Sequence, residues 1–341
     1  MRIPLAAALL SMLPSIWVVQ TSGIDTNLRG VSVASYRGPE GTARSAVWAS
    51  GSNGVILRSP DGRAPWIQLH VSGGENLDFR SIQALDDKTA YVMSSGEGEK
   101  SRIYKTTDGG QNWALQYNGS RQTFFLDALV CDSPVHCLAL SDPVDGKFLL
   151  LATNDGETWR PLSEDSMPLA LKDEGAFAAS GTCLLLYGKD IYFITGGPAA
   201  RLFHSPDMGR MWSVTPLPIV SGNAAAGAFS IARRGKNMVV VGGDYKNPQR
   251  HDRVATYSHD AGRTWKLAKQ PPAGYRSAVA WLDDHTIATV GPTGEEISVD
   301  RGMHWKPSGS QNLNAVAALN YADAWAIGEK GTICHFSNGK Q

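Results

Sequence analysis

The stretch TTDGGQNW, from Thr106 to Trp113, combines turn-forming residues with a closing tryptophan, and close copies of it recur along the chain. Full copies are SPDMGRMW, SHDAGRTW and SVDRGMHW, and worn copies are SPDGRAPW and TNDGETW. The tryptophans that close these boxes lie 40 to 53 residues apart, at Trp66, Trp113, Trp159, Trp212, Trp265 and Trp305. A period of this length indicates a repeat architecture.

Each interval between boxes contains alternating apolar runs separated by turns, as in RSIQALDDKTAYVMSSGEGEKSRIYKTTDGG. Four short antiparallel strands per interval make one blade of a β-propeller. The first strands are expected to begin near Val31, Arg80, Asp127, Phe177, Phe229, Arg276 and Asn314. The sequence therefore predicts an all-β fold, a seven-bladed β-propeller.

The last interval ends after three strands and has no box tryptophan. The N-terminal stretch WVVQTSGIDTNLRGVSV resembles WIQLHVSGGENLDFRSI, which begins at Trp66. We therefore expect residues from about Trp17 to supply the missing strand and close the ring, which removes an exposed sheet edge.

Within a box, the side chain of Asp108 can bond its own backbone, Gly110 tolerates a positive φ, and Trp113 covers the turn. We interpret the repeated residues as structural rather than catalytic or metal-binding. They are Asp108, Gly110, Trp113, Asp155, Trp159, Asp207, Trp212, Asp260, Trp265, Asp300 and Trp305.

The first 15 residues, MRIPLAAALLSMLPS, have one basic residue and a short apolar run, which is the layout of a secretory signal peptide. The alternative is an uncleaved membrane anchor, which Pro4, Pro14 and the shortness of the run disfavour. Cleavage as late as residue 23 stays open, although it would remove the closing strand. We expect an exported protein, periplasmic or secreted, whose residues 16–341 form a single propeller.

Composition narrows the partners and the redox state. Basic and acidic residues number 32 each, so no net field favours nucleic acid, and any membrane contact is expected to be indirect.

Export permits disulfides. Cys131 and Cys137 flank a turn and could pair across a hairpin, or could stay reduced; Cys183 and Cys334 are expected to be buried free thiols.

The box pattern resembles the Asp-box, or BNR, repeat of WD40/YVTN/BNR-like propellers. Such boxes occur in sialidases, in xyloglucan-cleaving glycosidases and in photosystem II assembly factors of the Ycf48 kind. FRSIQALDD, ALSDPVDGKF, ITGGPAARLFHSPDMG, VVVGGDYKNP and VGPTGEE narrow the similarity to the Ycf48-like bacterial family related to plant photosystem II stability/assembly factors. The resemblance covers nearly all of the chain after residue 25. It implies a propeller and an assembly role, although Asp boxes occur in enzymes and non-enzymes alike.

Propellers usually bind ligands where inner-strand entries and the loops between second and third strands meet the central channel. The residues expected there are Arg80, Arg276, Asp127, Asp142, Asp244, Tyr245 and Asn314, with Arg29, Asp145 and Glu295 nearby. Both signs of charge converge, which suits a protein or peptide partner held by charge-assisted hydrogen bonds. The alternative is that these charges only tie neighbouring blades together.

A glycoside hydrolase is the competing hypothesis, with Asp142 and Asp244 as its carboxylate pair. The chain has no HExxH, GxSxG, P-loop or dinucleotide motif, and its eight histidines have no ligand spacing. We expect no cofactor and no metal. The favoured interpretation is an exported, monomeric, non-catalytic binding or assembly scaffold.

Overall fold

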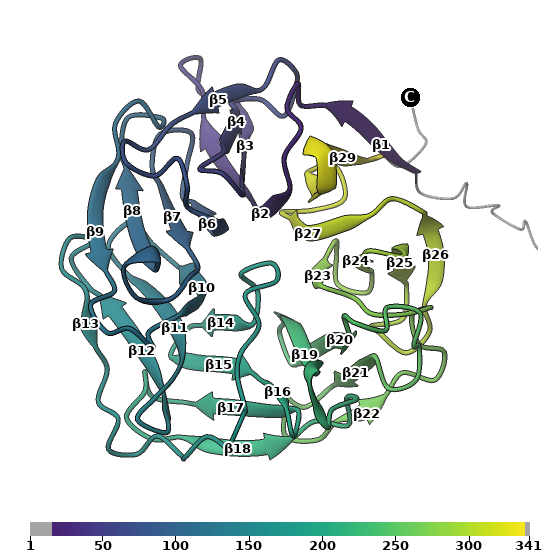
Figure 1. Cartoon of the computed structure of the whole chain (residues 1–341). Helices are drawn as coiled ribbons and strands as arrows, with labels where there is room; N and C mark the ends of the chain where they lie inside the picture. The colour runs from purple at the N-terminus through teal and green to yellow at the C-terminus, as the bar shows by residue number, and fades with distance from the viewer. Residues whose placement is uncertain (1–15, 338–341) are drawn as a thin grey trace, which may run out of the picture.

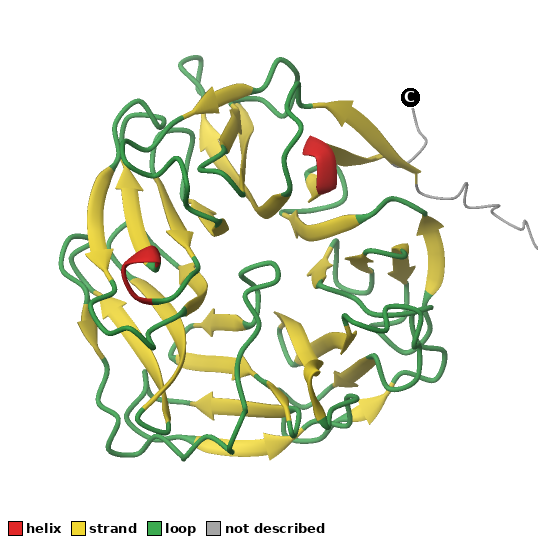
Figure 2. Cartoon of the chain, viewed as in Figure 1, coloured by secondary structure: helices red, strands yellow, loops and turns green. Residues whose placement is uncertain are grey.

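A computed structural model describes residues 16–337, which form seven antiparallel sheets arranged in a ring around a central channel (Figure 1). Strands dominate, and the only helices in this range are the short 3-10 turns η1 (Gly98–Lys100) and η2 (Glu329–Gly331) (Figure 2). No helix among residues 16–337 has the length and apolarity needed to cross a bilayer. The predicted seven-bladed propeller is confirmed. The proposed signal peptide, residues 1–15, lies outside the described residues.

Blades 1 to 3 each follow the chain order from the channel outward. Blade 1 contains β2 (Leu28–Arg37), β3 (Ala43–Gly51), β4 (Ile56–Ser59) and β5 (Ile67–Leu69). Blade 2 contains β6 (Phe79–Ala84), β7 (Ala90–Ser94), β8 (Arg102–Thr106) and β9 (Ala114–Asn118). Blade 3 contains β10 (Leu126–Cys131), β11 (Cys137–Val144), β12 (Lys147–Thr153) and β13 (Arg160–Pro161).

Blades 4 to 6 repeat this order, with one added strand on the inner side of blade 5. Blade 4 contains β14 (Leu184–Tyr187), β15 (Asp190–Ile194), β17 (Arg201–Ser205) and β18 (Ser213–Pro216). Blade 5 contains β16 (Gly196–Gly197), β19 (Asn223–Arg234), β20 (Asn237–Asp244), β21 (Ala255–Ser258) and β22 (Lys266–Leu267). Blade 6 contains β23 (Ala278–Trp281), β24 (Ile287–Gly291), β25 (Gly294–Ser298) and β26 (Lys306–Gly309).

Blade 7 joins the two ends of the chain. Its strands β27 (Leu313–Ala318), β28 (Ala324–Gly328) and β29 (Thr332–Ser337) are completed by β1 (Ile16–Thr21), which pairs antiparallel with β29. Trp17 of β1 is buried and packs edge-on against Phe336, with ring centroids 5.0 Å apart. The N-terminal strand therefore closes the ring, as the sequence predicts.

Blade 4 departs from the expected pattern on its inner side. The sequence places its first strand near Phe177, but β14 begins only at Leu184. Residues 176–183 leave the sheet and contact blades on other sides of the channel. Arg80 Nη1 of blade 2 donates to Ala178 O (3.3 Å), and Ser180 Oγ donates to Ser277 O beside blade 6 (2.9 Å). This segment, called the cross-channel segment below, therefore occupies space inside the ring.

The boxes form one repeated hydrogen-bond pattern on the turns before the outer strands. In the box of blade 2, Thr106 Oγ1 donates to Asp108 Oδ1 (2.8 Å) and accepts from Gly110 N (3.0 Å), while Asn112 N donates to Asp108 Oδ1 (3.0 Å). These donors hold the pKa of Asp108 at about 2. The equivalent carboxylates accept the same kinds of bonds and also have lowered pKa values; they are Asp155, Asp207, Asp260 and Asp300. Because local donors satisfy these carboxylates, we interpret them as structural residues of the turns.

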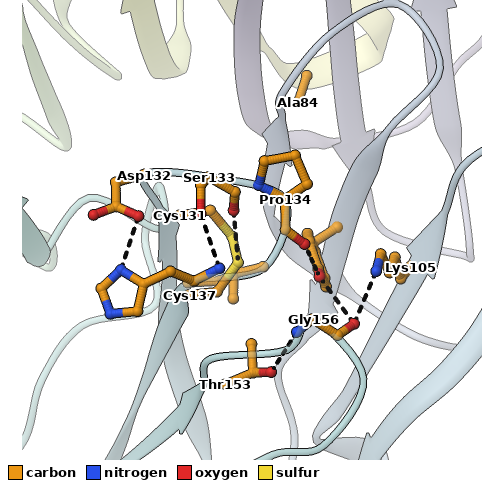
Figure 3. The surroundings of a disulfide bond; sticks show 12 residues. Ala84, Lys105, Cys131, Asp132, Ser133, Pro134, Cys137, Thr153 and Gly156 are labelled. Carbon is orange, nitrogen blue, oxygen red and sulfur yellow. Dashed lines mark hydrogen bonds and ion pairs between the residues drawn. A yellow bond between two sulfur atoms is a disulfide. The ribbon is translucent and has the colours of Figure 1, made fainter.

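Two of the four cysteines lie where blades 2 and 3 meet. Cys131 and Cys137 face each other across the β10–β11 hairpin and form a disulfide (Figure 3). Tyr91 Oη of blade 2 donates to Pro134 O (2.8 Å) in the turn that the disulfide closes, and also to Gly156 O (3.1 Å). The disulfide therefore closes a turn that accepts a hydrogen bond from the neighbouring blade 2. Cys183 and Cys334 are buried and unpaired, and all four cysteines lie within residues 16–337.

The box tryptophans differ in burial, which predicts unequal effects of their removal. Trp305 is 1% exposed and its Nε1 donates to Gly302 O (3.1 Å), whereas Trp113 is only partly buried, meets Trp48 edge-on and has no partner for its Nε1. We expect Trp305→Ala to lower the free energy of unfolding by about 3–5 kcal/mol. Trp113→Ala should cost less. Urea unfolding of both variants measures this, and an equal loss would contradict it.

Ring closure gives a second prediction. A chain that begins after residue 23 lacks β1, loses the buried Trp17 and exposes the edge of β29. Its free energy of unfolding should fall by at least about 3 kcal/mol, and its monomer should aggregate through the open edge. A chain that begins at Ser15 keeps β1 and is the matched control. Equal melting temperatures for the two chains would rule out a stabilising role for β1.

Candidate functional site in the central channel

A cavity of about 530 Å³ lies in the channel, and every blade contributes to its lining. Charged and polar lining residues are Arg29, Arg80, Asp127, Asp142, Ser277, Asn312, Asn314 and Glu329. Aromatic lining residues are Phe125, Phe177, Phe229, Tyr245 and Tyr275, and the cross-channel segment adds Ala176, Ala178 and Ala179. A concave site that mixes aromatic faces with a few polar groups is the usual form of a ligand site.

The backbone explains why these side chains reach the cavity. Five inner strands carry a register shift near their start, where one extra residue interrupts the pairing with the second strand. A β-bulge of this kind re-aims a side chain away from the normal alternation. The extra residues are Arg29, Arg80, Asp127, Phe229 and Asn314, and all five line the cavity. The repeated bulge is therefore the device that builds the site.

The cationic side of the cavity comes from blades 1 and 2. Arg80 Nε donates to Asp78 Oδ2 (2.6 Å), so that its charge is already paired. Arg29 forms no ion pair among residues 16–337, and its buried Nε has no hydrogen-bond partner there. Burial, followed by the nearby charge of Arg80, lowers the pKa of Arg29. Asp78 and Glu329 oppose this lowering, but neither forms an ion pair with Arg29.

The anionic side comes from blade 3. Asp127 is 1% exposed, and neither of its carboxylate oxygens has a hydrogen-bond partner among the described residues. Asp142 sits at a second register shift, between β11 and β12, and its Oδ1 accepts from Ala176 N (2.8 Å). Burial and the charge of Asp142 raise the pKa of Asp127 well above its usual range, against the opposing effect of Arg80. Burial also raises the pKa of Asp142, to about 6.

Aromatic rings fill the opposite wall. Phe177 of the cross-channel segment stacks on Phe229, with ring centroids 3.8 Å apart. Tyr245 and Tyr275 meet Phe229 edge-on, at 6.3 and 4.7 Å between centroids. Burial raises the pKa of the Tyr275 phenol, which keeps it neutral. This wall offers flat apolar faces next to the charged groups.

The structure brings together most of the residues that the sequence nominates, but not all of them. Arg80, Asp127, Asp142, Tyr245 and Asn314 line the cavity. Asn314 Nδ2 also donates to Asn27 Oδ1 (2.6 Å) and Leu28 O (2.8 Å), so it ties blade 7 to blade 1 as well.

Arg276 differs from the sequence expectation that it points into the channel mouth beside Arg80. It is 1% exposed, lies outside the cavity lining, and donates from Nε to Glu296 Oε2 (3.2 Å) and from Nη1 to Thr293 Oγ1 (2.7 Å). Strands β23 and β24 of blade 6 pair without a register shift, so no bulge re-aims this side chain. The buried carboxylate of Glu296 draws the guanidinium into the blade.

Asp244 is also placed differently from the glycosidase hypothesis. It is buried at the end of β20, accepts from Lys246 N (3.0 Å) and Asn223 Nδ2 (3.3 Å), and does not line the cavity with Asp142. The two carboxylates therefore do not flank a common substrate position. Residues 16–337 also contain no cluster of three or more His, Cys, Asp or Glu side chains suited to a metal ion.

Sequence reasoning nominated Tyr245 but missed the rest of the aromatic wall. Phe177 and Phe229 stand at two of the expected first-strand starts, in register with Arg80 and Asp127. The sequence prediction favoured polar and charged residues and left these two rings out. The same alignment of first-strand starts that nominated Arg80 contains both of them. Phe125 and Tyr275 precede such positions by one or two residues and carried no separate signal.

The buried acid gives a pH-dependent prediction. Because the pKa of Asp127 is raised on folding, its contribution favours the folded state below the ordinary pKa of about 4 and is lost as pH rises toward the folded value. Asp127→Asn removes that loss. We expect it to raise the free energy of unfolding at pH 8 by about 1–3 kcal/mol and to change it little at pH 4. Asp145→Asn, whose side chain is 88% exposed, is the control. Destabilisation of Asp127→Asn at pH 8 would contradict the assignment.

Comparison with known proteins shows which proteins this chain resembles. No protein-family model matches it. The photosystem II assembly lipoprotein Ycf48 of Synechococcus sp. strain CC9902 is 22% identical over 270 residues, which cover 77% of this chain and 69% of that protein. Similar solved structures include YCF48 bound to D1 peptide (TM-score 0.64, 13% identity, 96% of this chain and 98% of that one). YCF48 from Cyanidioschyzon merolae gives 0.64 at 14% identity (94% and 98%), and the WD40 propeller domain of Doa1 gives 0.58 at 12% (95% and 98%). This chain is therefore a homologue of Ycf48 with a seven-bladed propeller fold.

Proposed function

We propose that this protein is a non-catalytic scaffold that holds a peptide segment of a partner protein in its central cavity during assembly of a complex. The observation that carries the proposal is the bulge repeated on five inner strands, which aims Arg29, Arg80, Asp127, Phe229 and Asn314 into one cavity. Side chains that a fold turns away from its own core toward an open space are available to a ligand.

The relatives support the class of partner. The Synechococcus homologue is named a photosystem II assembly lipoprotein, and one solved YCF48 structure is described as bound to D1 peptide. From these two names we infer only that the ligand of this chain is a peptide segment. The guanidinium of Arg29, which forms no ion pair among residues 16–337, and the aromatic wall suit a segment that carries a carboxylate beside apolar side chains.

Location is part of the same proposal. The signal-like first 15 residues and the lipoprotein name of the homologue support an exported protein, periplasmic or secreted. A glycoside hydrolase has less support, since Asp244 does not share the cavity with Asp142.

Affinity capture with the full chain from its native envelope, followed by calorimetry with the captured segment, tests the function. We expect Arg29→Lys/Arg80→Lys to keep the fold and the charge but to weaken binding by about 1–3 kcal/mol, because an ammonium cannot replace a bidentate guanidinium. Arg121→Lys, on a side chain that is 65% exposed and outside the cavity, is the control. Unchanged affinity in the double variant would remove the arginines from the site. Hydrolysis of an aryl glycoside by the wild-type chain would favour an enzyme instead.

A further inference from the structure

We propose that the carboxylates of Asp127 and Asp142, called the acid pair below, receive a cationic group of the bound partner, an ammonium or a guanidinium. The inference rests on the proposed function and sharpens it. It requires the partner segment to carry a positive charge, which the two arginines of the cavity would not by themselves predict.

The first support is the unpartnered state of Asp127. Its side chain is 1% exposed, it stands at the bulge of β10, and it lines the cavity. Both of its oxygens lack a hydrogen-bond partner among residues 16–337. A buried carboxylate without donors is costly, and proteins normally supply a donor or a cation. A group supplied by a ligand would meet this need.

The second support is the absence of a resident cation. Neither carboxylate of the acid pair forms an ion pair within residues 16–337. The nearest candidate, Arg80, is held by Asp78 Oδ2 (2.6 Å) and by Ala178 O (3.3 Å). The remaining titratable neighbour is the thiol of Cys183, whose pKa burial raises, so it stays neutral and donates no charge. The negative charge of the pair is thus left for an incoming group.

The third support is the position of the pair relative to the ring faces. Phe125 lies next to β10 in sequence, and Phe177 belongs to the segment whose neighbour Ala176 donates to Asp142 Oδ1 (2.8 Å). Both aromatic rings line the same cavity. An ammonium or guanidinium beside a carboxylate gains further from an aromatic face. The cavity therefore offers an organic cation aromatic faces as well as carboxylates.

The cavity consequently has two ends of opposite charge. Arg29 from blade 1 forms no ion pair among residues 16–337, and neither does the acid pair from blade 3. They do not form an ion pair with each other. A ligand that satisfies both ends carries a carboxylate and a basic group within the span of a cavity of about 530 Å³.

Binding of small probes to the full chain tests the acid pair directly. The probes are N-acetyl-lysine methylamide, N-acetyl-arginine methylamide and the uncharged N-acetyl-norleucine methylamide, titrated by calorimetry at pH 8. We expect the better basic probe to bind at least tenfold more tightly than the norleucine probe, and the two basic probes separate ammonium from guanidinium. Asp127→Asn and Asp142→Asn should each weaken the basic probes at least tenfold. Asp145→Asn, in the turn that follows β11 and 88% exposed, should leave them unchanged.

Two outcomes would overturn the inference. One is equal affinity for the norleucine and basic probes; the other is unchanged affinity for the basic probes in both acid-pair variants, with folding verified by melting curves. These results are separable from the fate of the proposed function. Partner binding that depends on Arg29 and Arg80 but not on Asp127 would reject the cation site and keep the scaffold. Basic probes that bind the acid pair while no peptide partner is captured would keep the cation site and reject the scaffold.

Discussion

The pairing of β1 with β29 is the contact on which the ring depends. In a propeller each blade packs against its two neighbours, so a missing outer strand on one blade weakens the circle and leaves backbone donors and acceptors unpaired. Here the closing strand comes from the other end of the chain, some 300 residues away, and it is anchored by Trp17 on Phe336. Asn314 adds a tie between blade 7 and blade 1 through its bonds to Asn27 and Leu28.

A closed ring fixes the width of the channel, and this allows a small local device to become a site. One extra residue in an inner strand would be a minor irregularity in an open sheet. Around a closed ring, bulges at the same height on several blades direct their side chains toward one axis. The charges that meet there have few local partners: Arg29 is partly buried and Asp127 is buried, and both keep unpaired polar atoms. Such groups destabilise the free protein, and function at a ligand site is a common reason for them.

The boxes show the opposite arrangement. Their carboxylates accept bonds from the backbone and from Ser or Thr within four residues, and this lowers their pKa values at or near the surface. Satisfied, locally bonded acids stabilise turns, whereas Asp127 has no local donor at all. Hydrogen-bond satisfaction, rather than residue type, therefore separates the box aspartates of this protein from Asp127.

The sequence by itself determined whatever depends on a repeat or on neighbours along the chain. The box period predicted a repeat architecture, and the expected first-strand starts predicted seven blades. The match between Trp17 and Trp66 predicted the closing strand, and two apolar runs joined by a turn placed Cys131 where it could face Cys137. Tertiary structure alone decided the path of residues 176–183 across the channel, because their partners Arg80 and Ser277 lie nearly 100 residues away on other blades. It also decided that Arg80 faces the cavity while Arg276, in an aligned stretch, turns into its blade toward Glu296. Periodicity fixes where a residue stands in a blade, but the direction of its side chain follows from the bulge and from the charge that it meets across the fold.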